Sequence, residues 1–198
     1  MIKPHSDHGP LPAWVGRKVR LRGIEAADHR TLAGFDRSSA QIGGYRHRAA
    51  HRARTDDDLQ LAIETLRDGM LVGSISVIQA SDRFSYGIGI GPPHRCCGYA
   101  ADAVTALLAF MFGRHGYHKC EVSIYGGNFA SLALHGSLGF REEARRRDTE
   151  LLRGEIKYPV LMGITAYEFA ARHPDFTLSR AHSRRGRHWR GRGRHWVG

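Results

Sequence analysis

The sequence has little cysteine and no long hydrophobic run, and both shortages exclude classes of protein. Its three cysteines, two of them adjacent at positions 96 and 97, form no disulfide framework. No spacing of cysteine, histidine and carboxylate residues suggests a zinc site, so no metal is expected. The longest apolar-rich run, Ala103–Phe112, is about half as long as a membrane span, which needs ~20 residues. The first residues lack the hydrophobic segment of a signal peptide. These absences predict a cytoplasmic protein without a membrane partner.

Carboxylates are scarce relative to basic side chains, and the imbalance is concentrated at one end of the chain. Thirty lysines and arginines stand against nineteen aspartates and glutamates, which gives a formal net charge of +11. Residues 179–198 hold seven of the arginines and no carboxylate, so the other 178 residues carry a net charge of only +4. A basic protein invites a nucleic-acid interpretation. Because the excess lies in a tail without apolar periodicity, we expect nucleic acid to be at most a partner of that tail.

Hydrophobic periodicity predicts one αβ domain over residues 17–172, between an irregular lead-in at 1–16 and a disordered tail at 173–198 that is rich in Arg, Gly, His and Trp. The predicted strands lie around Val19–Leu21 and at 59–65, Leu71–Ile78, Phe84–Ile90, 119–124, Phe140–Arg146 and 156–164, and the predicted helices at Glu25–Phe35, 99–113 and Asn128–Ser137, with Tyr45–Arg54 partly helical. An antiparallel meander is followed by alternating strands and helices. This order predicts an α+β fold with a mixed sheet.

A glycine-containing loop, Arg95–Ala100, precedes the helix at 99–113. The start of a helix offers unpaired N–H groups and the positive end of the dipole, and both attract anions. Gly98 lets a ligand approach the backbone, and Arg95 can bind a phosphate. In the preceding strand, glycines at 87, 89 and 91 alternate with isoleucines, which often marks the close approach of a ligand or of another backbone. On these features alone, a phosphate site and an ordinary capped helix remain equally open.

A second motif decides between these interpretations. Asn128 and Ser131 follow the next strand and lead to Gly139-Phe140. With this segment the chain resembles the GNAT superfamily of N-acetyltransferases over residues 17–170. Arg95-x-x-Gly98-x-Ala100 is similar to the family's coenzyme A pyrophosphate loop, and Asn128 to Phe140 is similar to its N-x-x-[S/A]…L-G-F segment. Within the superfamily, the closer resemblance is to the ribosomal-protein N-terminal acetyltransferases.

The resemblance implies a central, mostly antiparallel twisted sheet flanked by helices, with acetyl-CoA as co-substrate in a splay between the two central strands. It also implies the coenzyme-binding residues: Ile88, Gly89 and Ile90 for the pantetheine arm, Arg95, Cys96, Cys97, Gly98, Tyr99 and Ala100 for the pyrophosphate, and Asn128 and Ser131 near the thioester. Cys96-Cys97 departs from the family pattern, in which basic or glycine residues are usual. Because the backbone amides remain, binding is expected to survive this departure.

Acyl transfer to an amine needs a neutral nucleophile, a polarised thioester carbonyl and a proton for the leaving thiolate. Glu150 lies where the resembling subgroup carries a glutamate that acts as a base through water, and the alternative is a solvated carboxylate. Glu64 and Asp148 are weaker candidates for the base. Ser131 and His135 lie at i, i+4 on one helix face and are candidates for the proton donor. For His135 the alternative is a packed or solvated side chain.

These observations predict an acetyl-CoA-dependent N-acetyltransferase, either a monomer or a homodimer. It would transfer an acetyl group to a primary amine, a protein N-terminus or a small molecule, by direct attack in a ternary complex. The alternative from another class is a non-catalytic, coenzyme A-binding protein of the same fold, which the basic tail tethers to nucleic acid. The acceptor itself is not predicted by any motif.

Overall fold

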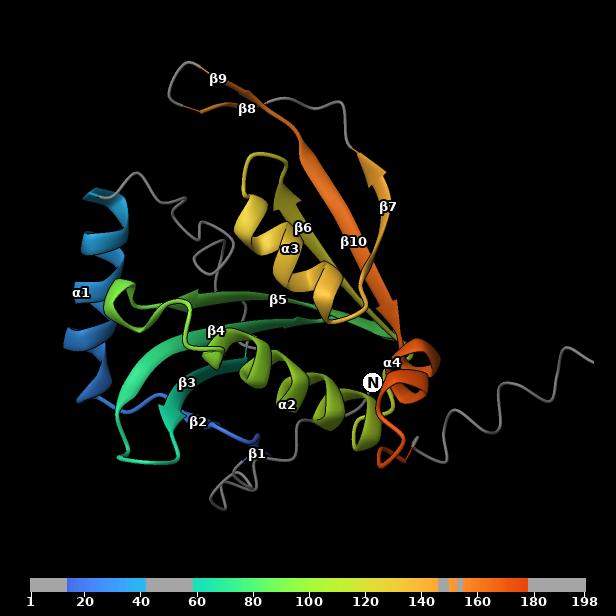
Figure 1. Cartoon of the computed structure of the whole chain (residues 1–198), viewed down its shortest axis with the longest axis horizontal. Coiled ribbons are helices and arrows are strands. Elements are labelled where there is room, and N and C mark those ends of the chain that lie inside the picture. The colour runs from blue at the N-terminus through green and yellow to red at the C-terminus, as the bar shows by residue number, and fades with distance from the viewer. Residues whose placement is uncertain (1–13, 42–58, 146–149, 153–154, 178–198) are drawn as a thin grey trace, which may run out of the picture.

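The computed structural model describes residues 14–41, 59–145, 150–152 and 155–177 (Figure 1). Its centre is an eight-stranded sheet in the order β1-β2-β3-β4-β5-β6-β10-β7, and β8 and β9 form a separate hairpin. The strands of the large sheet are β1 Trp14–Val15, β2 Val19–Gly23, β3 Leu59–Thr65, β4 Leu71–Gln79, β5 Arg83–Ile90, β6 Lys119–Tyr125, β10 Pro159–Thr165 and β7 Arg141–Arg145. The hairpin consists of β8 Glu150–Leu152 and β9 Glu155–Lys157. Every neighbouring pair is antiparallel except β5 and β6, which confirms the predicted mixed, mostly antiparallel sheet.

The described helices are α1 Asp28–Gln41, the short 3₁₀ turn η2 Pro92–His94, α2 Tyr99–Gly113, α3 Phe129–Ser137 and α4 Ala166–Arg172. Helix α2 has the predicted bounds. Helix α1 begins three residues later than predicted, because the N–H of Asp28 bonds to the carbonyl of Glu25 at 3.0 Å and closes a turn there. The Asp28 carboxylate accepts the Glu25 N–H at 2.8 Å in return. This exchange holds residues 25–28 in a turn ahead of the helix.

One face of the sheet packs on α2 and forms the core. Alternate residues of β3 and β4, such as Ile63 and Ile75, point to this face and are fully buried, as are Leu107, Leu108 and Met111 of α2. The helix buries these positions because they recur at i, i+1 and i+4 along one stripe. Burying one such side chain contributes about 1.5–3 kcal/mol. The core therefore fixes α2 firmly against the meander.

The structure differs from the sequence-based expectations at both ends of the domain. Residues 1–16 are predicted to be irregular, but Trp14–Val15 forms β1, and the Trp14 ring stacks on Phe110 with 3.9 Å between ring centroids. The tail is predicted to start at residue 173, but the Phe176 ring lies 5.0 Å from Phe169 and packs against the core. A pair of residues and a single aromatic side chain are too short to give a periodic signal, which explains both differences.

The predicted strand 156–164 is divided between β9 and β10. The predicted helical stretch Tyr45–Arg54 and the arginines of residues 179–198 lie outside the described residues. In the described part of the chain, no helix is both long enough and apolar enough to cross a membrane.

Candidate active site

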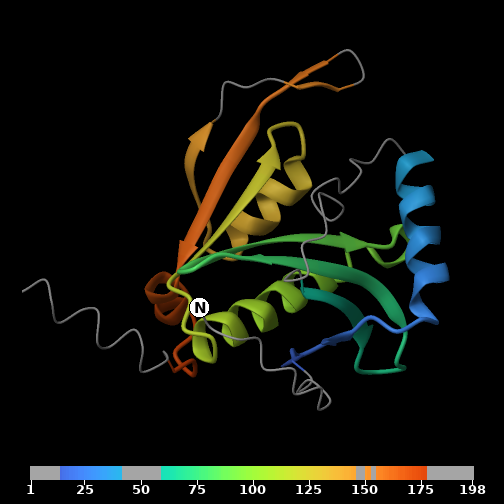
Figure 2. The ribbon, with the colours of Figure 1, turned by 180° about the vertical axis from the view of Figure 1, so that it is seen from behind.

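The two central strands part from each other almost as soon as they meet. β5 and β6 run parallel and are paired only at Arg83 with Lys119 and at Phe84 with Cys120. Beyond these pairs they spread like the arms of a V, which is visible from both sides (Figures 1 and 2). On its other side β5 stays paired with β4 as far as Ile90. The edge of β5 that faces β6 is therefore open, and an open strand edge can bind an extended ligand through its main chain.

The predicted pantetheine-binding residues Ile88–Ile90 lie on this arm of the splay and are half-buried. At the end of the same arm the chain turns through η2 into the Arg95–Ala100 loop. Phe35 of α1 packs edge-on against His94, with 5.7 Å between ring centroids, and so supports η2 from outside. Strand β5, the turn η2 and the Arg95–Ala100 loop thus follow one another along the side of the splay that faces β6.

The backbone of the Arg95–Ala100 loop has the conformation and the unpaired N–H groups that an anion site needs. Gly98 is the N-cap of α2 and has a left-handed conformation with φ 81°, and Cys96 also has a positive φ of 60°. The first helical hydrogen bond runs from the N–H of Asp102 to the carbonyl of Gly98 at 3.2 Å, so the amides of residues 99–101 have no partner within the helix. Both thiols, Cys96 and Cys97, are exposed. Such outward amides at a helix start suit a phosphate group.

Asp102, in the first turn of α2, was not a predicted site residue, yet it holds the loop in place. Its carboxylate accepts the backbone N–H groups of Arg17, Lys18 and Val19 at 2.9, 2.7 and 2.9 Å. A Cβ on Gly16 would lie 2.3 Å from the carboxylate, so the close approach requires glycine there. These contacts lock the β1–β2 turn onto the start of α2. From the sequence alone, Asp102 is an acidic residue that complements the helix dipole.

Replacing Asp102 by asparagine should loosen this connection. An amide has one acceptor oxygen, and its NH₂ group would face backbone donors that the carboxylate now satisfies. We expect Asp102→Asn to lower the free energy of unfolding by about 2 kcal/mol, measured by urea denaturation. Asp175→Asn, at an exposed aspartate after α4, is the matched control and should leave the midpoint within error. Equal midpoints for both variants would show that the three contacts give no net stabilisation.

Helix α3 follows β6 and lies beside it on one flank of the splay, and three of the predicted residues lie at its start or within it (Figure 1). Asn128 is its N-cap, and the side-chain oxygen accepts the N–H of Ser131 at 3.2 Å. His135 lies one turn further on, 3% exposed, with Nδ1 2.7 Å from the carbonyl of Ser131. A carbonyl only accepts, so Nδ1 carries the hydrogen and Nε2 accepts the Tyr86 hydroxyl, 2.9 Å away. The structure thus brings Asn128, Ser131 and His135 together and adds Tyr86.

The prediction that His135 is a proton donor is not supported by this arrangement. Both of its ring nitrogens are occupied by the protein, and burial lowers the pKa of His135, which favours the neutral ring. The ring is packed on Tyr86 and lies 5.0 Å from the ring of Phe140. Because burial favours the neutral ring and both of its nitrogens are bonded within the protein, the role of His135 as a proton donor stays a prediction, and Ser131 is the alternative on the same helix face.

Tyr86 and His135 instead connect the two sides of the splay. Tyr86 lies on β5, two residues beyond the last residue that pairs with β6, and His135 lies on α3. Their hydrogen bond crosses the gap where the ladder of backbone hydrogen bonds has ended. Tyr86 is buried, which raises the pKa of its hydroxyl and keeps it protonated as the donor. The pair therefore fixes the distance between β5 and α3.

Glu64, a weaker candidate for the base, lies in an ion-pair cluster and not in the splay. It is 5% exposed and receives hydrogen bonds from Arg20 and Arg22 on the neighbouring strand β2. Burial alone raises the pKa of Glu64, but the hydrogen bonds from Arg22 and Arg20 outweigh it and leave the pKa below its ordinary value. A carboxylate held ionised by two guanidinium groups is a weak base, so Glu64 is not retained as a candidate.

Comparison with known proteins identifies the arrangement. Residues 18–141 match the family model of the acetyltransferase (GNAT) domain, and this stretch includes the splay, the Gly98 loop and α3. The chain belongs to the GNAT acetyltransferases. A curated relative, the SPbeta prophage-derived uncharacterized N-acetyltransferase YokL of Bacillus subtilis (strain 168), is 26% identical over 171 residues, which cover 81% of this chain and 97% of the relative. The uncharacterized N-acetyltransferase p20 of Bacillus licheniformis is 27% identical over 92 residues, 46% of this chain and 52% of that protein.

Solved structures share the fold. A GNAT-family acetyltransferase from Bacillus anthracis matches with a TM-score of 0.65 and 16% identity, over 77% of this chain and 98% of that one. Spermidine N-acetyltransferase from Vibrio cholerae, in complex with CoA and spermine, matches with a TM-score of 0.64 and 18% identity, over 76% of this chain and 97% of that one. A provisionally named ribosomal-protein-serine acetyltransferase from Vibrio cholerae matches with a TM-score of 0.61 and 22% identity, over 79% of this chain and 98% of that one. These likenesses show the fold and leave the acceptor undetermined.

This GNAT acetyltransferase is thus an acyltransferase, and its family uses acetyl-CoA. In the described residues, no group of three or more His, Cys, Asp and Glu side chains is placed to hold a metal ion. The backbone of Glu150 lies in the β8–β9 hairpin, paired with Lys157 and separate from the large sheet (Figure 1). The side chain of Glu150 and the whole of Asp148 lie outside the described residues. The role of Glu150 as a base therefore stays a prediction.

Proposed function

We propose that this GNAT acetyltransferase is an acetyl-CoA-dependent N-acetyltransferase that acts on a primary amine, a protein N-terminus or a small molecule, by direct attack in a ternary complex. The observation that supports it best is the splay of β5 and β6, bounded by the Gly98 loop at one end and by α3 on its flank. The backbone of Ile88–Ile90 would bind the pantetheine arm, and residues 95–100 the pyrophosphate.

The residues present fit this coenzyme. Gly98 has the left-handed conformation that glycine adopts without cost, and a Cβ there would lie 3.0 Å from Nζ of Lys18. That ammonium group is held beside the loop by a hydrogen bond of 2.9 Å to the carbonyl of Cys97. A cation, outward amides and a position without a side chain are together the chemistry that a diphosphate requires.

The reaction needs little acid–base assistance if the acceptor is an N-terminal amine. An α-amino group is neutral in roughly 10–20% of molecules at pH 7, whereas a lysine is neutral in only about one of 2,500. The amine nitrogen forms a bond to the acetyl carbonyl carbon, the carbon–sulfur bond breaks, the ammonium proton passes to a base, and the thiolate takes up a proton. Acetyl-CoA supplies the activated thioester.

The proton donor that we retain at the thiolate is Ser131. It is half-buried at the start of α3, and its Oγ lies 3.4 Å from Nδ1 of His135, whose hydrogen is directed to the Ser131 carbonyl. The hydroxyl can therefore donate to another group. We expect Ser131→Ala to lower kcat several-fold and to change KM for acetyl-CoA less, measured by thiol release. A fall in kcat/KM that comes from KM alone would assign Ser131 to coenzyme binding only.

For the base we retain Glu150. The pH dependence of kcat distinguishes a catalytic role of this residue from a structural one. At pH 7 an N-terminal acceptor is mostly protonated, so Glu150→Gln should lower kcat about tenfold on a peptide acceptor. The deficit should shrink as pH rises towards 9, because the amine then needs no base. Glu155→Gln, in the same hairpin, is the matched control and should behave like wild type at every pH. A deficit in Glu150→Gln that is constant from pH 7 to 9 would contradict the assignment.

Thiol release with a panel of peptides and small amines also tests the proposed function as a whole. Acetyl-CoA bound without thiol release on any acceptor would favour the non-catalytic alternative. Turnover with N-terminal peptides but not with polyamines would place the enzyme near the ribosomal-protein subgroup that it resembles, and the reverse result would place it among the small-amine acetyltransferases.

A further inference from the structure

Two adjacent thiols lie in the loop ahead of α2, and no step of the proposed reaction uses their side chains. Cys96 and Cys97 are both exposed, whereas Cys120, the third cysteine, is fully buried on β6. Burial raises the pKa of the Cys120 thiol well above its usual range, so this thiol stays protonated and inert. Of the three cysteines, only the adjacent pair is therefore open to an oxidant in solution.

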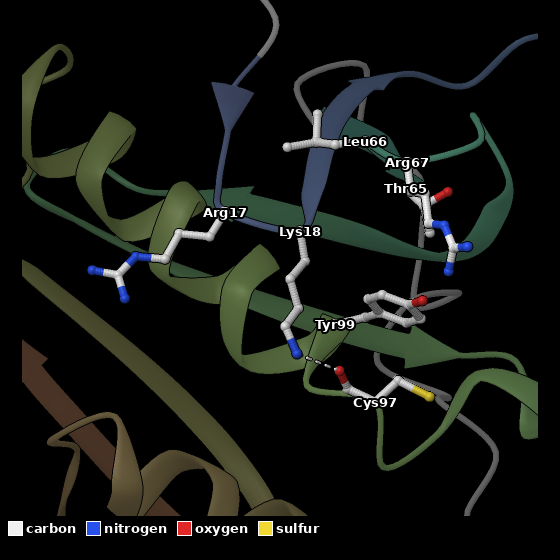
Figure 3. A pocket seen from close by; sticks show the side chains of 7 residues that line it. All are labelled: Arg17, Lys18, Thr65, Leu66, Arg67, Cys97 and Tyr99. Atoms are coloured by element: carbon white, nitrogen blue, oxygen red, sulfur yellow. Dashed lines mark hydrogen bonds between the residues drawn. The ribbon is translucent and has the colours of Figure 1, made fainter.

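The contacts of Cys97 direct its sulfur back towards the residue that carries the other thiol. Its carbonyl accepts Nζ of Lys18 at 2.9 Å, and its side chain points away from that contact (Figure 3). The Cys97 thiol donates to the carbonyl of Arg95 at 3.3 Å, a contact that spans Cys96. Cys97 also lines a pocket of about 460 Å³, which has room for a small molecule. Its sulfur is thus accessible and lies on the Cys96 side of the loop.

Adjacent cysteines can form a disulfide, but only with strain. A trans peptide bond joins Cys96 to Cys97, and such a bond separates neighbouring Cα atoms by about 3.8 Å. Ordinary disulfides join Cα atoms that are roughly 4.4–6.8 Å apart. A strained disulfide is more easily reduced, and labile disulfides are typically the regulatory or catalytic ones. The pair therefore suits a reversible oxidation and not a permanent crosslink.

A disulfide between these residues would change the backbone that faces the proposed coenzyme site. The bond would close a small ring that includes the peptide bond, so it would constrain ψ of Cys96 and φ of Cys97. The N–H of Cys97 belongs to this peptide unit and is one of the predicted pyrophosphate donors. The open loop has left-handed conformations at Cys96, with φ 60°, and at Gly98, with φ 81°. Ring closure would therefore reorient an amide directly ahead of the N-cap Gly98.

We propose that Cys96 and Cys97 form a redox-sensitive modification site, at which hydrogen peroxide reversibly switches off acetyl-CoA binding. The inference rests on the proposed function. One sulfur attacks the peroxide, the O–O bond breaks, and the thiol becomes a sulfenic acid while water leaves with the thiol proton. The second sulfur attacks the sulfenic sulfur, the S–O bond breaks, and a second water leaves as the disulfide forms. Two thiols are thus oxidised, one peroxide is reduced, and thiol exchange with a reductant reverses the change.

The test combines peptide mass with calorimetry on acetyl-CoA, before and after one equivalent of hydrogen peroxide. After peroxide, the peptide that carries both cysteines should have lost two hydrogens, and affinity for acetyl-CoA should fall by at least about tenfold. Dithiothreitol should restore the mass and the affinity together. No disulfide, a disulfide that leaves affinity unchanged, or a loss that the reductant does not reverse would overturn the inference and leave the proposed function intact.

Two variants, each compared with itself before and after peroxide, show which thiols take part. Cys97→Ser keeps one exposed thiol, which cannot close the ring, so its affinity should fall less than that of wild type. An equal fall would mean that a single oxidised sulfur blocks the loop, and the paired site would be wrong. Cys120→Ala lacks only the buried thiol and should respond as wild type does; a lost response would also overturn the inference. Failure of reduced wild type to bind acetyl-CoA would overturn the proposed function, and the peptide mass would still decide whether the disulfide forms.

Discussion

Replacing Gly98 by tryptophan is expected to abolish measurable acetyl-CoA binding. Gly98 has a φ of 81°, which costs other residues about 1–2 kcal/mol, and its missing Cβ leaves space that a side chain would take from the Lys18 ammonium group 3.0 Å away. An indole there would also cover the amides at the start of α2. The strain and the lost phosphate contacts together predict a fall in affinity of at least a hundredfold. Calorimetry with acetyl-CoA measures it.

Two controls separate loss of the site from loss of the fold. Gly98→Ala adds the backbone strain and a single Cβ 3.0 Å from Nζ of Lys18, but no larger side chain, so its affinity should lie between that of wild type and Gly98→Trp. Gly34→Ala on α1 introduces a Cβ that meets nothing within 4 Å and should bind acetyl-CoA normally. The thermal midpoint of Gly98→Trp should stay within a few degrees of wild type. Tight binding by a folded Gly98→Trp would show that the coenzyme does not use this loop.

The loop and the elements next to it could be predicted because their signals are local. Helix α2 was predicted with its bounds since a periodic apolar stripe ends at glycine-containing segments on both sides. The meander followed from alternating apolar residues separated by turn dipeptides. Gly98 itself follows from a general rule, because a glycine ahead of a helix that binds an anion allows both the left-handed conformation and close approach.

The contacts that hold the site together could not be predicted, because their partners are far apart in the chain. Asp102 and Lys18 are separated by 84 residues, and Tyr86 and His135 by 49. The spacing of Ser131 and His135 correctly indicates one helix face, but spacing does not say what lies opposite that face. The residue opposite is Tyr86, a strand residue that belongs to no motif, and its ring and hydroxyl pack against His135. A buried tyrosine hydroxyl needs a partner, and no sequence pattern names it.

The hydrogen bond between Tyr86 and His135 predicts a large loss of stability when it is broken. His135→Ala removes a ring that is 3% exposed and leaves the Tyr86 hydroxyl buried without a partner. The cavity and the unpaired donor together should lower the free energy of unfolding by about 3–5 kcal/mol. Tyr86→Phe removes only the hydroxyl and should cost about 1–2 kcal/mol. Urea denaturation of both variants measures these losses.

A double variant tests whether the bond itself, and not only packing, is responsible. In Tyr86→Phe combined with His135→Leu, neither side chain needs a hydrogen bond, so no polar atom of the pair is left buried and unpaired. The double variant should therefore be more stable, by about 1–2 kcal/mol, than the summed losses of the single variants Tyr86→Phe and His135→Leu predict. Strict additivity would show that the two residues contribute independently and that the bond across the splay is energetically unimportant.

The same pair makes stability depend on pH in a defined direction. Burial lowers the pKa of His135 in the folded chain, so the unfolded chain, with a pKa of about 6.5, takes up the proton first. Stability is therefore complete above pH ~6.5 and is lost as pH falls from there towards the lowered folded value. Burial also lowers the pKa of His115 and of His173, with the same sign, so the loss is shared. Asp28 and Glu64 have pKa values below their ordinary ones and act at lower pH.

His135→Leu should consequently flatten the decline in stability between pH 7 and 5, although it is less stable than wild type at pH 7. The control, His29→Gln, alters an exposed histidine on α1 and should keep the wild-type slope. The measurement is the urea midpoint at half-unit intervals of pH. An undiminished slope in His135→Leu would mean that His135 is protonated in the folded chain. Its Nε2 would then be a donor facing Tyr86, and a role of His135 as proton donor would gain support.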